Sequence, residues 1–228
     1  MFMAFICKFA RTLKRFTIVT PHKNDARPTC FRWGAGVFAV LAFPTLFFGL
    51  SSCEQIAISA MNQITTTHFQ VQDDQLFMSG EINNRTLDQF ENVIALNPNI
   101  TTLVELEVPG SIDDNTMIAL AYRVRELGLN THLTATSEIY SGGVDLFLAG
   151  VQRTMEPGAI IGVHSWSDGT RDAKDYPPDA PEHEMNRQYV EQMLGNDAFY
   201  WFTIYAAPAD DIYIMNDTEI RQYGLLTR

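Results

Sequence analysis

The chain has 228 residues, a formal net charge of −11 and 46% hydrophobic residues, which suffice for the core of one domain. Seven of its 16 basic residues and one of its 27 acidic residues lie before position 33, so the remainder carries nine basic and 26 acidic residues, a net charge of −17. A body with that charge repels nucleic acid and anionic lipid, which argues against nucleic-acid binding.

An uncharged run from Trp33 to Cys53 follows the basic N-terminal segment. Its apolar part, Gly36–Leu50, is 15 residues long, which is short for a membrane span but typical of the core of an export signal. Pro44 also disfavours a straight spanning helix. The run ends in Leu50-Ser51-Ser52-Cys53, which resembles the cleavage box of bacterial lipoproteins. That resemblance implies that Cys53 is acylated and becomes the new N-terminus.

The alternative for residues 1–53 is an uncleaved signal anchor. Under the lipoprotein interpretation, Glu54 stands where Asp favours retention at the inner membrane in many such bacteria. The expected location is therefore the cell envelope, lipid-anchored to the outer membrane and facing the periplasm. No cysteine follows Cys53, so the folded part has neither a disulfide nor a cysteine metal site.

We expect residues 54–67 to be a polar tether and residues 68–228 to form one domain. Short segments of alternating or continuous apolar residues predict strands at His68–Val71, Leu76–Met78, Thr101–Val108, Thr131–Thr136, Ile160–Val163 and Asp211–Met215. Apolar residues at helical spacing predict helices at Asn84–Leu96, Asp113–Leu127, Ser141–Gly150, Pro181–Tyr205 and Glu219–Tyr223. Strands that alternate with helices predict an α/β fold with layers around a largely parallel sheet.

Three features of this predicted sheet suggest chemistry. The turn Pro109-Gly110-Ser111 follows a strand and can direct backbone N–H groups into a cleft. Ser141 begins a helix, where free N–H groups favour negative charge, and the following glycines Gly142 and Gly143 let a substrate approach closely. His164 ends the strand IIGV and can reach a serine on a neighbouring strand.

In order and spacing, these features resemble the Clp protease proteolytic subunit and its crotonase-fold relatives. The chain contains VPGSIDD, SGGVDLFLAGVQR and EPGAIIGVH in the family's order, and 23 positions separate Ser141 from His164. LFMSGEI and EIRQYGLLT resemble the family's opening strand and closing helix, so the resemblance runs from Leu76 to Thr227. It implies a single-domain, layered β-α-β fold of the ClpP/crotonase type.

The resemblance also implies the catalytic residues. Ser141 would be the nucleophile, His164 the general base, and Asp211 the carboxylate that orients the imidazole, with Asp210 as the substitute because the register here is slightly shifted. Asp145, one helical turn after Ser141, departs from the family and has no assigned role.

The implied oxyanion hole consists of N–H groups at Gly110, Ser111 and Gly142. Ser111 departs from the second glycine that the family usually has, which makes the close approach of a substrate harder. The acidic, proline-rich segment 165–181 lies where the family carries its oligomer-building element. It is predicted to be either a lid over the site or an ordinary surface loop.

The function predicted from the sequence is an envelope serine hydrolase, a peptidase that uses Ser, His and Asp with a backbone oxyanion hole. The expected partners are a peptide or acyl substrate, the membrane through the lipid anchor, and other copies of the chain in a homo-oligomer. No cofactor and no metal are expected. One alternative is a catalytically inactive lipoprotein that uses the fold as a binding scaffold. Another is acyl-thioester chemistry of the crotonase type, which is less favoured because that chemistry needs no Ser–His pair at this spacing.

Overall fold

A seven-stranded sheet organises residues 66–227, the part of the chain that the computed structural model describes. Its strand order is β1-β2-β3-β4-β6-β7, and β5 pairs with the first half of β4. The strands β2, β3, β4 and β6 run parallel, whereas β1 and β7 are antiparallel at the two edges. The bounds are β1 (His68–Gln72), β2 (Gln75–Ser79), β3 (Thr102–Val108), β4 (Asn130–Tyr140), β5 (Arg153–Met155), β6 (Ile160–Val163) and β7 (Tyr213–Ile214).

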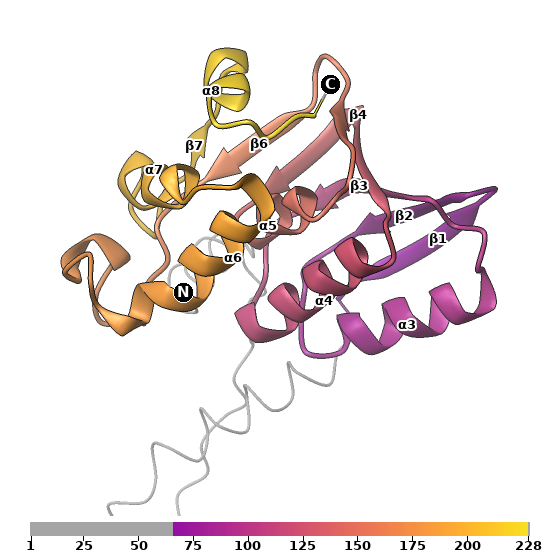
Figure 1. Ribbon diagram of the computed structural model, residues 1–228, viewed down its shortest axis with the longest axis horizontal. Helices are drawn as coiled ribbons and strands as arrows, with labels where there is room; N and C mark the ends of the chain where they lie inside the picture. The colour runs from indigo at the N-terminus through magenta and orange to yellow at the C-terminus, as the bar shows by residue number, and fades with distance from the viewer. Residues whose placement is uncertain (1–65, 228) are drawn as a thin grey trace, which may run out of the picture.

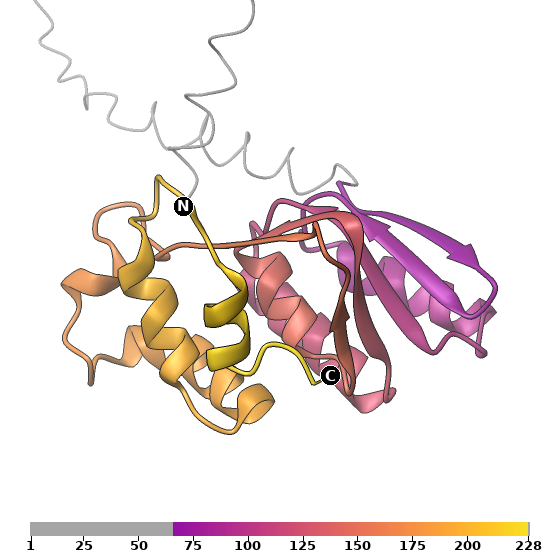
Figure 2. The same cartoon turned by 90° about the horizontal axis from the view of Figure 1, so that it is seen from above.

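The helices form two groups. α3, α4 and α5 pack beside one another along the sheet, and α6, α7 and α8 gather near β6 and β7 (Figures 1 and 2). Contacts of α5 with α6 join the two groups. The bounds are α3 (Thr86–Leu96), α4 (Asp114–Glu126), α5 (Gly142–Leu148), α6 (Glu184–Leu194), α7 (Ala198–Ala206) and α8 (Asp217–Gln222), with 3-10 turns at η1 (Ala173–Asp175) and η2 (Pro181–His183).

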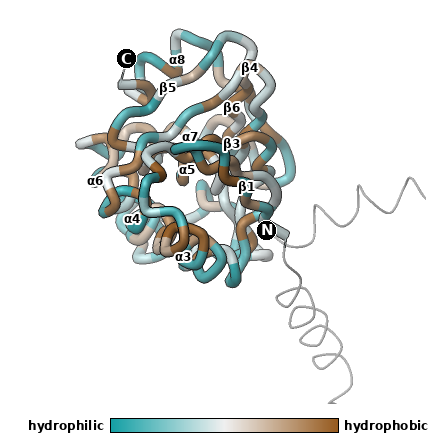
Figure 3. Tube along the Cα trace, turned by 90° about the vertical axis from the view of Figure 1, so that its right-hand side faces the viewer, coloured by the Kyte–Doolittle hydropathy of each residue, from teal (hydrophilic) through white to brown (hydrophobic). Residues whose placement is uncertain are grey.

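Helix α4 illustrates why these elements form where they do. The Asp113 carboxylate accepts a hydrogen bond from the Thr116 backbone N–H at 3.2 Å and so caps the helix. Met117, Leu120 and Val124 recur at helical spacing and are buried against the sheet. Figure 3 shows hydrophobic segments concentrated in the interior around α5 and the central strands, with hydrophilic segments over much of the outer surface.

The predicted α/β class, with its largely parallel sheet, is confirmed, but several boundaries differ. β4 extends to Tyr140, beyond the predicted end at Thr136, because its second half pairs with β6 after a register shift opposite β3. The short strand β5 was not predicted. Each of these features depends on pairing between distant segments, which local periodicity does not report.

The single helix predicted for Pro181–Tyr205 was wrong, because α6 ends at Leu194 and α7 begins at Ala198. Gly195 caps α6 in the left-handed conformation with φ of 82°, which a right-handed helix cannot continue through. The break turns the aromatic helix α7 back onto the core.

Thr66 and Thr67, which the sequence placed in the predicted tether, are hydrogen-bonded to the domain. The hydroxyls of Thr66 and Thr67 donate hydrogen bonds to the Glu81 carbonyl at 2.7 and 2.8 Å, and Thr67 is buried. The export segment, Cys53 and most of the predicted tether lie outside the described residues. Within residues 66–227, no helix is both long enough and apolar enough to cross a membrane.

Candidate active site

The candidate site lies where three neighbouring parallel strands end. β3 leads into Gly110-Ser111, β4 into Ser141, and β6 into His164. The Ser141 backbone N–H donates to the Gly162 carbonyl at 3.1 Å, which fixes the end of β4 against β6. Ser141, Gly142 and His164 line a common pocket of about 50 Å³. The fold therefore assembles the three motifs that the sequence singled out.

Ser141 has a strained backbone. Its φ of 51° and ψ of −123° are rare for a residue with a side chain, and among residues 66–227 only Asp73 is another non-glycine residue with positive φ. Such a conformation costs on the order of 1–3 kcal/mol and persists only where the surroundings enforce it. Here the hydrogen bond to Gly162 enforces it on one side. On the other side, the Ser141 carbonyl accepts from Val144 N–H at 2.8 Å and Asp145 N–H at 3.2 Å.

The Gly110-Ser111 turn contacts the start of α5. A Cβ on Gly110 would lie 3.2 Å from Ser141 Cβ, and a Cβ on Gly142 would lie 2.7 Å from Ser111 Oγ and 3.0 Å from Ser111 N. A hydrogen bond from Ile82 N–H to the Gly110 carbonyl, at 2.9 Å, holds the turn. The turn and the helix start thus touch beside the Ser141 side chain.

Two backbone donors remain available at this contact. Gly142 is the first residue of α5, where the N–H group has no partner within the helix. Among the hydrogen bonds of the described region, none is donated by the N–H of Ser111 or of Gly142. The Ser111 hydroxyl donates to Asp114 Oδ1 at 2.8 Å. An oxyanion hole needs backbone donors placed in this way beside the nucleophile.

His164 is half-buried at the end of β6. Burial lowers the pKa of His164 below its ordinary 6.5, against the opposing effects of backbone groups of Ser165 and Ala209 and of the Asp114 charge. The imidazole is therefore neutral at pH 7, as a general base must be. Its Nδ1 atom is buried and has no hydrogen-bond partner in the described region.

The structure does not bring the predicted third residue to His164. Asp210 and Asp211 are both exposed, and the Asp211 carboxylate accepts from the neighbouring Ile212 N–H at 2.9 Å. The turn closed by Asp211 N–H on the Pro208 carbonyl keeps this segment at the surface, and within it the Ala209 backbone acts on the imidazole. Across residues 66–227, no hydrogen bond joins His164 to Ser141 or to a carboxylate.

Two other aspartates line the pocket instead. Asp145 lies on α5 four residues after Ser141, and Asp114 opens α4 three residues after Ser111. Burial, together with the negative charge of Asp114, raises the pKa of Asp145 to about 7. Of these two aspartates, the sequence singled out only Asp145, and without a role. The sequence feature that could have identified both is their spacing of one helical turn from Ser141 and Ser111 respectively.

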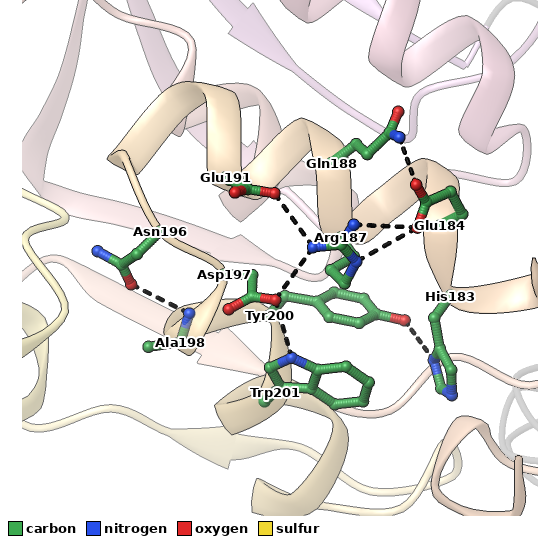
Figure 4. Close-up of polar contacts among 10 residues, drawn as sticks. All are labelled: His183, Glu184, Arg187, Gln188, Glu191, Asn196, Asp197, Ala198, Tyr200 and Trp201. Atoms are coloured by element: carbon green, nitrogen blue, oxygen red, sulfur yellow. Dashed lines mark hydrogen bonds and ion pairs between the residues drawn. The ribbon is translucent and has the colours of Figure 1, made fainter. Parts of the chain in front are cut away.

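An aromatic and ionic cluster supports the far side of the pocket (Figure 4). The Tyr200 hydroxyl is joined to His183 Nδ1 at 2.7 Å and accepts from Trp166 Nε1 at 3.0 Å. Arg187 on α6 binds Asp197 at 3.2 Å, and Asp197 accepts from Trp201 Nε1 at 3.1 Å.

The predicted loop 165–181 contributes to this wall, because Trp166 packs on Tyr176 and His183 with ring centroids 5.5 and 5.6 Å apart. Tyr176 and His183 are buried. Trp166 and Tyr176 thus anchor the segment in the packed structure, while residues 168–171 and 177–179 are exposed at the surface. Within the described part of the chain, no group of three or more His, Cys, Asp or Glu side chains could hold a metal ion.

Comparison with known proteins identifies the fold. ClpP1 from Listeria monocytogenes superposes with a TM-score of 0.50 at 15% identity, over 68% of this chain and 89% of that one. A 1510-N membrane-bound stomatin-specific protease variant in complex with a substrate peptide gives 0.47 at 19% identity, over 67% and 71%. A putative enoyl-CoA hydratase/isomerase (crotonase) from Legionella pneumophila gives 0.47 at 12% identity, over 73% and 70%.

No protein-family model and no curated protein matches the sequence. At these identities the likeness is one of fold. The domain has a layered α/β fold like that of ClpP1, as its sequence motifs predicted.

Proposed function

We propose that the domain is a serine hydrolase that cleaves peptide bonds, with Ser141 as nucleophile and His164 as general base. The observation that carries this proposal is the strained Ser141 at the start of α5, beside two free backbone N–H groups and in one pocket with a neutral histidine. Strain maintained at such a position is characteristic of active sites. The fold is shared with proteases and with hydratases, so the site and not the fold supports the choice.

In the proposed reaction, Ser141 Oγ attacks the scissile carbonyl carbon while His164 accepts the hydroxyl proton. The N–H groups of Ser111 and Gly142 stabilise the resulting oxyanion. The intermediate collapses as His164 returns the proton to the leaving amine, and an acyl ester remains on Ser141. His164 then deprotonates a water molecule that attacks the ester, and the Ser141 hydroxyl is regenerated.

A fluorophosphonate probe on the purified full-length chain tests this proposal, because the probe reports an activated serine without a known substrate. Ser141→Ala should abolish labelling, and His164→Ala should reduce it by about a thousandfold or more. Ser79→Ala, which changes a serine of β2 outside the pocket, should label normally. Unchanged labelling of the Ser141→Ala protein would rule out the assignment.

The inactive binding scaffold is the second candidate, and one observation favours it. Across residues 66–227, His164 bonds to neither Ser141 nor a carboxylate, so nothing in the described structure fixes the imidazole on the nucleophile. A correctly folded wild-type chain that fails to react with the probe at any pH between 5 and 9 would select this candidate.

We further propose that the domain is held in the bacterial envelope by a lipid on Cys53, at the outer membrane and facing the periplasm. The support is Leu50-Ser51-Ser52-Cys53 directly after the apolar run. Cys53→Ala should block labelling by a fatty-acid analogue and leave the precursor uncleaved; normal processing would refute the anchor.

Self-association is also predicted from the resemblance, and the mass of the purified chain in detergent checks it.

A further inference from the structure

The pocket beside Ser141 and His164 has an unusual inner lining. It contains the carboxylates of Asp114 and Asp145 and the amide of Asn186, and no lysine or arginine among residues 66–227 lines it. The Asn186 Oδ1 atom is buried and has no hydrogen-bond partner in the described region. The pocket is also lined by the apolar side chains of Val144, Val163, Val190 and Phe199.

We propose that this pocket is a specificity subsite that binds the ammonium group of a lysine side chain next to the scissile carbonyl. The inference rests on the proposed hydrolase activity and gives it a substrate class, lysine-containing peptides or other alkylammonium acyl compounds. The residues that determine the preference are Asp145, Asp114 and Asn186.

The polar groups of the pocket match an ammonium. A lysine ammonium has three donors and no acceptor, and the pocket supplies two carboxylates and one unpaired amide oxygen. A buried acceptor without a partner is destabilising, so a ligand that donates a hydrogen bond to Asn186 relieves that cost. The Tyr200 hydroxyl is already engaged by His183 and Trp166.

The size and walls of the pocket also fit a lysine. At roughly 10–15 Å³ for each water, its volume of about 50 Å³ holds roughly four heavy atoms. A lysine side chain has four heavy atoms beyond Cβ. Its methylenes would contact the apolar walls while its charged end reaches the aspartates, the arrangement in which lysine is commonly buried.

The charges that face one another in the pocket support the same occupant. Burial and the charge of Asp114 raise the pKa of Asp145 to about 7, because two carboxylates close together repel. The negative charge of Asp114 also raises the pKa of His164, against the larger effect of burial. A bound ammonium would offset the negative charge of the two aspartates. Since Asp145 becomes charged as the pH rises through about 7, the preference for a cation should increase over that range.

Two ester substrates with the same number of side-chain carbons test the proposal. N-acyl-lysine and N-acyl-norleucine p-nitrophenyl esters differ in the terminal ammonium, so their kcat/KM ratio isolates its contribution. The full-length wild-type chain should prefer lysine by at least about tenfold, as expected for one charge-assisted contact. Asp145→Asn and Asp114→Asn should each reduce the ratio by about tenfold, whereas the exposed Asp179→Asn should leave it unchanged.

Reaction with the fluorophosphonate separates failure of this inference from failure of the hydrolase. A chain that reacts with the probe but shows a ratio near one keeps its proposed function and loses the lysine subsite. Binding of n-butylammonium tests the pocket without catalysis. n-Butylammonium should raise the Tm of the wild-type chain more than sodium chloride does at the same ionic strength. For the Asp145→Asn variant, the two salts should have the same effect on the Tm. Equal Tm shifts in the two proteins would overturn the inference even if no ester is cleaved.

Discussion

At the scale of single residues, Ser141 and His164 are held by different forces. Backbone hydrogen bonds at both ends force Ser141 into a positive-φ conformation. His164 is positioned by the end of β6 and kept neutral by burial, without a carboxylate on its ring in the described structure. The strained conformation of Ser141 is thus maintained against a local energetic cost, which substitutions at this position can measure.

Replacing Ser141 by glycine should yield a more stable protein than replacing it by alanine, by about 1 kcal/mol. Both variants lack the hydroxyl, but only glycine adopts φ of 51° without steric cost. Urea unfolding measures the difference. The same pair of substitutions at Ser79 in the strand β2 should give the opposite order, because glycine destabilises an ordinary strand. Equal stability of the two Ser141 variants would argue against the strain.

The rate of fluorophosphonate labelling should fall as the pH is lowered, with a midpoint below 6.5, because burial lowers the pKa of the base His164.

The free energy of unfolding should also fall as the pH is lowered. The unfolded histidine binds a proton near pH 6.5 while the folded one does not, so the free energy of unfolding falls as pH drops below 6.5. A pH–rate profile and urea unfolding at several pH values check both. A labelling midpoint above 7 would contradict this account of His164.

At the scale of elements, the site depends on how closely the start of α5 approaches the turn after β3. Gly142 leaves no room for a Cβ against Ser111, and a Cβ on Gly110 would lie 3.2 Å from that of Ser141. Short-range contact between these two backbone segments places both free N–H groups beside one side chain. The glycines therefore set the spacing of the proposed oxyanion donors.

Gly142→Ala should reduce labelling by about a hundredfold, because its Cβ would lie 2.7 Å from Ser111 Oγ and push the two donors apart. Circular dichroism should show that the fold is kept. Gly169→Ala is the matched control. This loop glycine has φ of 93° and open space at its Cβ, so its substitution should cost about 1 kcal/mol of stability without loss of labelling. Full labelling of Gly142→Ala would show that the donors lie elsewhere.

At the scale of the whole molecule, Arg153 on β5 ties the C-terminal segment to the sheet. Its buried guanidinium donates to the carbonyls of Leu225 at 2.7 Å, Gly224 at 3.1 Å and Gly150 at 3.2 Å. Its backbone exchanges hydrogen bonds with Thr227. This one side chain therefore joins the end of α5 to the last residues of the described chain.

Arg153→Leu should lower the free energy of unfolding by about 3 kcal/mol, because buried carbonyls lose their charged donor. Labelling of the remaining folded protein should persist, since Arg153 does not line the pocket. Arg221→Leu, which removes an exposed arginine paired with Asp217, should cost less than about 1 kcal/mol. Chemical denaturation measures both, and similar losses in the two variants would refute the clamp.

The sequence by itself determined the fold class, most of the elements and the two side chains of the candidate active site. Strands and helices follow from local periodicity, which burial on one face imposes on each segment separately. Ser141 and His164 could be found because both terminate predicted strands within motifs whose order and spacing resemble one superfamily. The split between α6 and α7 at Gly195 was available in the sequence but was overridden by apolar spacing that continued across it.

Only the tertiary structure decided what surrounds these residues. Whether Asp211 or Asp114 acts on His164 depends on the direction of a surface turn and the start of a helix, which sequence order does not specify. The strain at Ser141 arises from a hydrogen bond to Gly162, 21 positions away, and the extension of β4 arises from pairing with β6. These contacts join segments that are distant in the sequence. A local pattern carries no information about them, because each strand could pair with several other strands until the chain has packed.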